Sequence, residues 1–144
     1  MKYGGGEALK SWGVSEDLII HAQISERDGQ ALVAAIAQNI PQHILQWMDA
    51  LPVSRSIGDY MFVHAGVRPK VPLDAQSDED MIWIRDPFLR SNADHGKKIV
   101  HGHSVVDEPQ LLPNRIGIDT GAYRTGVLTS VGIEDGEQWI VQSA

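Results

Sequence analysis

The sequence predicts an α/β (α+β) protein in which N-terminal helices precede a mixed sheet. Over residues 1–52 the apolar residues recur at helical spacing, whereas residues 53–144 hold short apolar runs separated by turn residues. Two of these runs end in histidine, one at His64 and the other at His101 and His103. Since ligands bind at strand ends in open α/β sheets, the same pattern predicts where the functional site lies.

Composition limits the classes of function that the chain can have. Its 144 residues suit a single domain with a core of its own. The net charge of −7, with no cluster of Lys and Arg, argues against nucleic acid or an anionic membrane as a partner. With no cysteine there is no disulfide or thiolate metal site. No apolar run suits a signal segment or a membrane span, so a cytoplasmic protein is expected.

The helical segment has two well-marked helix starts. Asp28 is predicted to cap one helix and Pro41 to open the next, since proline suits the first helical turn. Trp12, Trp47 and Trp139 are expected in the core. The residues expected to face inward from the two helices are Leu32, Val33, Ile36, Ile40, Ile44, Leu45 and Met48.

The sheet-rich segment begins with a predicted hairpin, whose strands 55–57 and 60–64 flank a turn at Gly58 and Asp59. Residues 78–89 read as one short helix, capped by Ser77 or Asp78. Further strands are predicted at 97–100, 115–119, 127–131 and 138–141.

The histidines at the strand ends are candidate metal ligands, because neutral imidazole is a common ligand of catalytic metal ions. His64 is followed by Ala65 and Gly66, which let a ligand approach the backbone; the alternative is a core histidine bonded to a carbonyl. His101 and His103 flank a glycine and would point to the same face of an extended backbone. Their alternative is a turn that leaves one histidine in solvent.

Two charged residues are further candidates. The fork of Arg85 suits a phosphate group, although an ion pair with Asp80 or Asp86 on the helix surface explains it equally simply. Asp119 follows another apolar strand and brings a carboxylate to the same sheet edge; its alternative is a turn-stabilising role.

Four ordered motifs resemble one family. They are His-Ala-Gly within 58–69, Trp-Ile-Arg-Asp at 83–86, His-Gly-His within 100–106 and Asp-Thr-Gly-Ala within 118–122. In order and spacing they are similar to the C-terminal portion of bacterial and phage phosphoprotein phosphatases. These belong to the calcineurin-like metallophosphoesterase superfamily, which also contains the symmetrical diadenosine tetraphosphate hydrolases.

The resemblance implies a partial β-sandwich flanked by helices, with two metal ions (manganese, iron or zinc) at one sheet edge. It implies that His64 and His103 bind one of these ions and that His101 is not a ligand. Arg85 would contact the substrate phosphate, and Asp119 would be a structural strand end near the site.

The family's other three motifs, Gly-Asp-x-His-Gly, Gly-Asp-x-x-Asp-Arg-Gly and Gly-Asn-His-Glu, do not occur in the sequence. The resemblance gives these motifs the bridging aspartate, the remaining ligands and the histidine that protonates the leaving group. We therefore expect residues 1–144 to be the C-terminal part of a single metallophosphoesterase domain. Such a chain would bind metal weakly or incompletely and would be inactive alone.

The expected function is hydrolysis of phosphate monoesters, as in a Ser/Thr-type protein phosphatase, with a phosphoprotein or a small phosphoester as partner. The alternatives are a dinucleoside polyphosphate hydrolase and a non-catalytic interaction domain that kept the fold. A further alternative is an intact enzyme that adds Asp107, Asp119 or His101 to His64 and His103. A homodimer is expected to cover exposed sheet surface.

Overall fold

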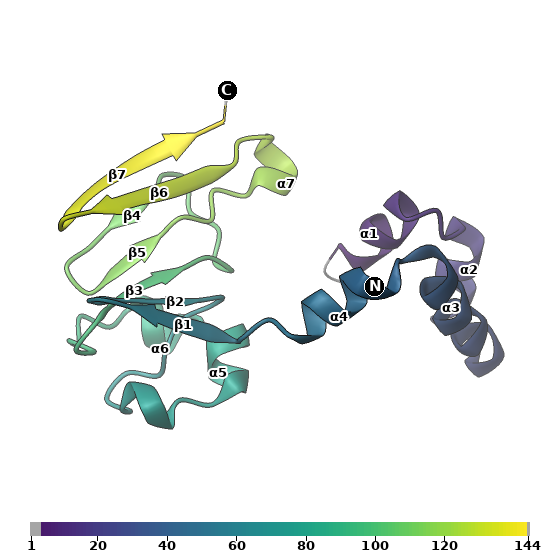
Figure 1. Ribbon diagram of the computed structural model, residues 1–144, viewed down its shortest axis with the longest axis horizontal. Coiled ribbons are helices and arrows are strands. Elements are labelled where there is room, and N and C mark those ends of the chain that lie inside the picture. Colours follow the sequence, from purple (N-terminus) through teal and green to yellow (C-terminus); the bar gives the residue numbers. More distant parts are fainter. Residues whose placement is uncertain (1–3, 144) are drawn as a thin grey trace. The chain divides into compact units, whose positions relative to one another are not determined.

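The computed structural model describes residues 4–143, and the chain divides into two compact units between Leu51 and Pro52 (Figure 1). Among the described residues, the first unit contains only helices and the second contains all the strands. Helices followed by a mixed sheet confirm the predicted α/β class.

The helical unit has a small core formed by Val14, Ile19 and Leu32. The cap of its longest helix differs from the prediction: the Ser25 hydroxyl accepts a hydrogen bond from the Asp28 N–H, so Asp28 lies in the first turn. Serine caps well because its short side chain reaches a free N–H two or three residues ahead. The helices of this unit are α1 (Gly5–Ser11), α2 (Glu16–His21), α3 (Glu26–Asn39) and α4 (Gln42–Asp49).

Several apolar side chains of the helical unit are not buried as predicted. Val33 is 67% exposed, Met48 56% and Trp47 61%, while Trp12 is 40% exposed. A helical stripe of apolar residues shows which face is apolar, but burial also requires a neighbouring element to cover that face.

The second unit is built on a five-stranded mixed sheet in the order β1-β2-β3-β5-β4. The central strands β2, β3 and β5 are parallel, and the antiparallel strands β1 and β4 lie at the edges. Because parallel neighbours end on the same side, the ends of β2, β3 and β5 form one edge. The strands are β1 (Ser54–Ile57), β2 (Tyr60–Val63), β3 (Lys98–His101), β4 (Gln110–Leu111) and β5 (Arg115–Gly117).

Helices pack on one face of the sheet and a β-hairpin packs on the other (Figure 1). Met61 and Ile99 are paired across β2 and β3 and pack with Phe88 in the main core, on the side of the helices α5 (Asp78–Trp83) and α6 (Asp86–Leu89). The other face carries the hairpin of β6 (Thr129–Glu134) and β7 (Glu137–Gln142), held by a hydrogen bond from Gln138 to the Tyr60 hydroxyl.

The single helix predicted at 78–89 is two helices, α5 (Asp78–Trp83) and α6 (Asp86–Leu89). Pro87 has no N–H to donate to the Trp83 carbonyl, and its ring would clash with that carbonyl in a continuous helix. The chain therefore leaves helical geometry at Ile84 and Arg85. This break places Arg85 between two helices rather than on the surface of one.

The hairpin at 55–64 and the other four strands form close to their predicted positions. Trp139, expected in the core, is 46% exposed and lies across Gly132 of the facing strand. The unpredicted elements are the strand β4, the short 3₁₀ helix η1 (Leu73–Ala75) and helix α7 (Ala122–Thr125). None of the helices in the described residues has the length and apolar character needed to cross a membrane.

Candidate functional site

Two histidines meet where β2 and β3 end. His64 follows the last residue of β2, and His103 lies two residues beyond β3. Their ring nitrogens Nε2 and Nδ1 are 3.1 Å apart, so one ring donates a hydrogen bond to the other. The backbone fixes this approach, because the Gly102 N–H donates to the His64 carbonyl at 2.9 Å.

The backbone at His103 is left-handed, with φ of 62°. The expectation of an extended backbone from His101 to His103 is therefore wrong: the chain turns at Gly102, where the Ser104 N–H approaches the Gly102 carbonyl. Histidine adopts positive φ more often than most residues, yet the conformation is uncommon and concentrates at functional sites. The turn directs His103 toward His64.

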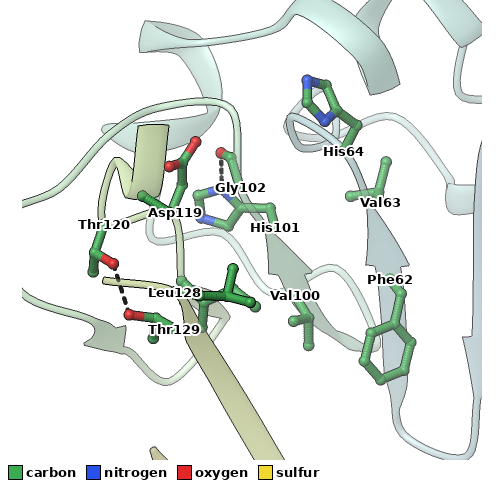
Figure 2. Close-up of a pocket in the computed structure, with 12 residues that line it drawn as sticks. Phe62, Val63, His64, Val100, His101, Gly102, Asp119, Thr120, Leu128 and Thr129 are labelled. Atoms are coloured by element: carbon green, nitrogen blue, oxygen red, sulfur yellow. Dashed lines mark hydrogen bonds between the residues drawn. The ribbon is translucent and has the colours of Figure 1, made fainter. Parts of the chain in front are cut away.

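The His101 ring does not take part in this contact, and it lies apart from His64 (Figure 2). It is 3% exposed, its ring stands edge-on to Phe88, and its Nδ1 is hydrogen-bonded to the Gly102 carbonyl. Burial lowers the pKa of His101 and so favours its neutral form. Its surroundings are those of a packed core histidine.

Arg85 lies against the turn that carries His103. Its Nη1 donates to the His103 carbonyl and to the Ser104 hydroxyl, both at 3.2 Å. The two acids that could have paired with it have other partners in the described part of the chain, since Asp80 binds Arg68 and Asp86 binds Arg90. The structure thus brings together His64, His103 and Arg85. Within residues 4–143, the Arg85 guanidinium contacts the neutral oxygen atoms of His103 and Ser104 and no carboxylate.

Asp119 stabilises a turn at the same sheet edge. Its Oδ1 accepts a hydrogen bond from the Gly121 N–H at 3.0 Å, and its carbonyl accepts one from Val106. Asp119 also lines a pocket of about 360 Å³ with His64 and His101 (Figure 2). It is a turn residue close to the site.

The distance between the two histidines suits a shared metal ion. Two imidazole nitrogens each about 2.1 Å from one ion lie about 3.0–3.4 Å apart at bond angles of about 90–110°. The observed 3.1 Å falls in that range. Burial and the nearby Arg85 lower the pKa of His103, which favours the neutral ring that a metal requires.

The ligand set for that ion is small. Over residues 4–143, no three His, Cys, Asp or Glu side chains gather closely enough to hold a metal, and Asp107 is exposed. His64 and His103 therefore fit as two ligands of one ion. Two neutral ligands without a carboxylate give a weak site.

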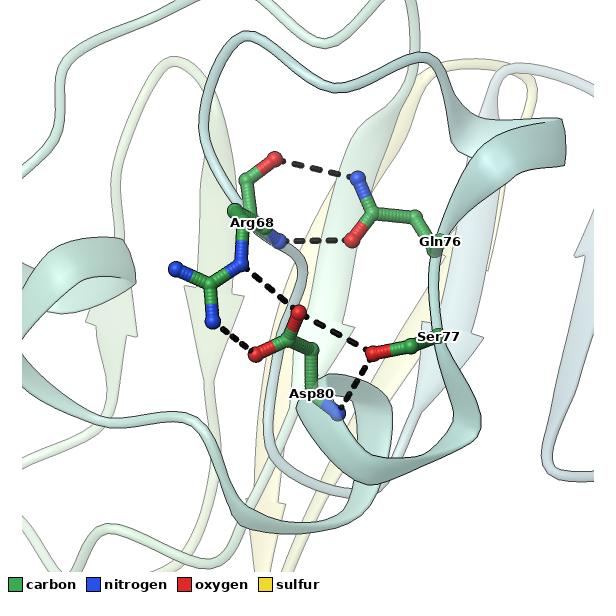
Figure 3. A network of polar contacts seen from close by, with 4 residues as sticks. All are labelled: Arg68, Gln76, Ser77 and Asp80. Atoms are coloured by element: carbon green, nitrogen blue, oxygen red, sulfur yellow. Dashed lines mark hydrogen bonds and ion pairs between the residues drawn. The ribbon is translucent and has the colours of Figure 1, made fainter.

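The loop after His64 is held by a polar network around Arg68 (Figure 3). The Arg68 guanidinium binds both carboxylate oxygens of Asp80, with Nε to Oδ2 at 2.7 Å. Asp80 also accepts a hydrogen bond from the Ser77 hydroxyl. The Gln76 side chain accepts a hydrogen bond from the Arg68 N–H and donates one to the Arg68 carbonyl. The network therefore connects the loop that follows β2 to the start of α5.

This network predicts a pH-dependent contribution to stability. The hydrogen bonds from Arg68 lower the pKa of Asp80, so the carboxylate stabilises the fold above its unfolded pKa of about 3.9 and loses that effect as pH falls through the lower folded value. We expect Asp80→Asn to lower the melting temperature at pH 7 and to converge with the parent protein in the acid range below about pH 4. A difference that stays constant from pH 7 to pH 2.5 in thermal melts would contradict this.

Three residues of the site were not identified from the sequence. They are Arg68, Trp83 and Ser104, and each lies next to a candidate motif. Trp83 directly precedes the break that positions Arg85, and its ring stands edge-on to His103 with centroids 5.8 Å apart. The proline at 87 was the available signal, since it excludes a continuous helix through this segment.

The fold and the histidine–arginine cluster at the strand ends define an α/β protein with a candidate site at one edge of its mixed sheet. The chain is similar in structure to a crystal structure described as "a putative diadenosine tetraphosphatase", with a TM-score of 0.61. The match covers 99% of this chain and 74% of that one, at 20% sequence identity. No protein family matches the chain by its sequence, and neither does any curated protein.

Proposed function

We propose that the sheet-containing unit carries part of a metal-dependent phosphoesterase site that acts on phosphate monoesters. The observation that carries this proposal is the contact of His64 and His103 at 3.1 Å with Arg85 bound to the same turn. A pair of metal-ligating imidazoles beside a guanidinium is suited to an anionic ester that needs charge stabilisation. The structural neighbour supports the same general chemistry.

In this proposal His64 and His103 hold a divalent ion, with manganese, iron or zinc as candidates. When bound, such an ion polarises the phosphoryl group and lowers the pKa of water. The chain's own residues supply the binding and orientation. Neutral imidazole is required at both positions, and the lowered pKa of His103 favours that form at pH 7.

Arg85 binds and orients the phosphate. Because its Nη1 is held by the His103 carbonyl and Ser104, the guanidinium cannot turn freely, and the charge remains available to an anion. A fixed fork matches two oxygens of one phosphate group. Arg85 therefore orients the ester relative to the histidine pair.

The four motifs favour a protein phosphatase of the Ser/Thr type as the functional class. A dinucleoside polyphosphate hydrolase is the second candidate, because that is the substrate class in the description of the structural neighbour. Both act on a phosphate group that binds beside Arg85, so the test of the site is common to them.

The metal site is tested by titrating the ¹⁵N-labelled chain with Mn²⁺ and following paramagnetic loss of amide signals. We expect weak binding that broadens the signals of residues next to His64 and His103. His64→Ala and His103→Ala should each weaken the affinity at least about tenfold, since half of the protein ligands are lost.

The matched control is His43→Ala, which removes an exposed histidine of α4 in the other unit. This variant should bind Mn²⁺ as the parent chain does. Broadening that is insensitive to both site variants, or that depends on His43, would contradict the proposal.

A further inference from the structure

A second pocket lies on the α5–α6 side of Arg85. It has a volume of about 500 Å³, and the residues that matter in its lining are Arg68, Glu79, Asp80, Trp83 and Arg85. Trp83 is 53% exposed, so solvent and ligands reach its ring. That ring also contacts His103, which places an aromatic surface directly beside the proposed phosphate site.

Charges in this pocket are balanced. Arg68 and Arg85 are each cationic, and Glu79 and Asp80 are each anionic. Arg68 is already bound at two nitrogens by Asp80 (Figure 3), so its charge is matched within the protein. An ester whose leaving group carries further phosphates would gain no net attraction there, because Glu79 opposes it.

Arg85 differs from Arg68, because its contacts in the described residues are to the neutral oxygens of His103 and Ser104. One uncompensated cation beside an exposed indole fits a ligand with one anionic group and an uncharged flat group next to it. A planar ring stacks on an indole face more favourably than an aliphatic chain does, which gives selectivity beyond buried area.

We propose that Trp83 determines specificity by receiving the leaving group, and that this pocket takes a phosphate monoester of an uncharged aromatic alcohol. This inference rests on the proposed function, since Arg85 must bind the phosphate. Within the protein phosphatase class it predicts tighter binding of tyrosyl than of seryl phosphate, which departs from the Ser/Thr preference that the four motifs favour. It also disfavours dinucleoside polyphosphates as ligands of this pocket.

The test compares three ligands that cannot be hydrolysed, with no metal ion added: phenylphosphonate, methylphosphonate and methylenediphosphonate. Binding is followed by the indole N–H signals, of which Trp83 is assigned with a Trp83→Phe variant. We expect phenylphosphonate to bind about five to ten times more tightly than methylphosphonate and to shift the Trp83 signal. The diphosphonate should bind no more tightly than methylphosphonate.

Trp83→Leu should bring phenylphosphonate to the affinity of methylphosphonate and leave methylphosphonate unchanged. Trp47→Leu, which removes an exposed tryptophan of α4, is the matched control and should change neither. Equal affinities of the two monophosphonates in the parent chain, or preference for the diphosphonate, would overturn the role of Trp83 but not the phosphate site at Arg85. Failure of every ligand to bind would overturn the phosphate site as well.

Two further ligands distinguish a tyrosyl phosphate in a protein from a small aryl phosphate. They are free phosphotyrosine and an uncharged peptide that contains phosphotyrosine. Tighter binding of the peptide would assign a protein substrate, and equal binding a small phosphoester. Both results support an aromatic leaving group on Trp83. A phosphoserine peptide that binds as tightly as the phosphotyrosine peptide would contradict it.

Discussion

Replacing Gly66 by alanine is expected to lower the free energy of unfolding of the sheet-containing unit by about 3 kcal/mol or more. Gly66 has φ of 149°, a backbone conformation that residues with a side chain rarely adopt. A Cβ at this position would lie 2.3 Å from Phe88 Cδ1. Phe88 is fully buried and therefore cannot move away without opening the core. Denaturant titration, read from amide exchange in β2 and β3, measures the loss.

Two comparisons separate the causes of this effect. Gly96→Ala also introduces a side chain at positive φ, 75°, but meets nothing within 4 Å, so it should cost only about 1–2 kcal/mol. Phe88→Ala alone leaves a cavity, yet combined with Gly66→Ala it should cost less than the sum of the two, since the clash is gone. Strict additivity, or equal losses at Gly66 and Gly96, would exclude a clash as the cause.

The close packing at Gly66 explains how the fold holds His64 at the sheet edge. Ala65, between these two residues, is fully buried and its N–H donates to the Met81 carbonyl of α5 at 2.8 Å. The chain thus leaves β2 next to α5, which ends at Trp83, two residues before Arg85. A small residue at 66 is needed because Phe88 fills the space against that turn.

Much of this fold could be predicted from the sequence, because short apolar runs between turn residues report local structure. The hairpin at 55–64 is an example: its turn at Gly58 and Asp59 fixes the register in which Ile57 faces Tyr60. Burial was predicted less well. Trp12, Trp47 and Trp139 are large apolar residues that stay partly exposed, since burial depends on which elements cover them.

The sequence located the candidate site but not the contacts within it. His64 and His103 lie at strand ends that a mixed sheet brings together, which the pattern of apolar runs indicates. The left-handed turn at His103 and the break before Arg85 are local departures from regular structure. Periodicity describes regular elements, so it does not predict how such departures aim a side chain.

Replacing Arg85 by methionine is expected to reduce the affinity for methylphosphonate at least about tenfold, because a charge-assisted, fork-shaped donor is lost. Arg85→Lys should give an intermediate affinity, since it keeps the charge but cannot donate two parallel hydrogen bonds to one phosphate. The Ser104 amide signal reports the titration directly, because Ser104 contacts the Arg85 guanidinium.

Arg90→Met is the matched control for this change. Arg85 directly precedes helix α6, and Arg90 directly follows it. The Arg90 side chain is 80% exposed, and among the described residues it binds only Asp86, at 3.3 Å. Its loss should leave phosphonate binding unchanged, whereas a general effect of positive charge would weaken binding in both variants. Suppose that the Arg85→Met variant keeps the amide spectrum of the parent chain and binds methylphosphonate equally well. That result would show that the phosphate lies elsewhere. The contact of Arg85 with the His103 turn would then be purely structural.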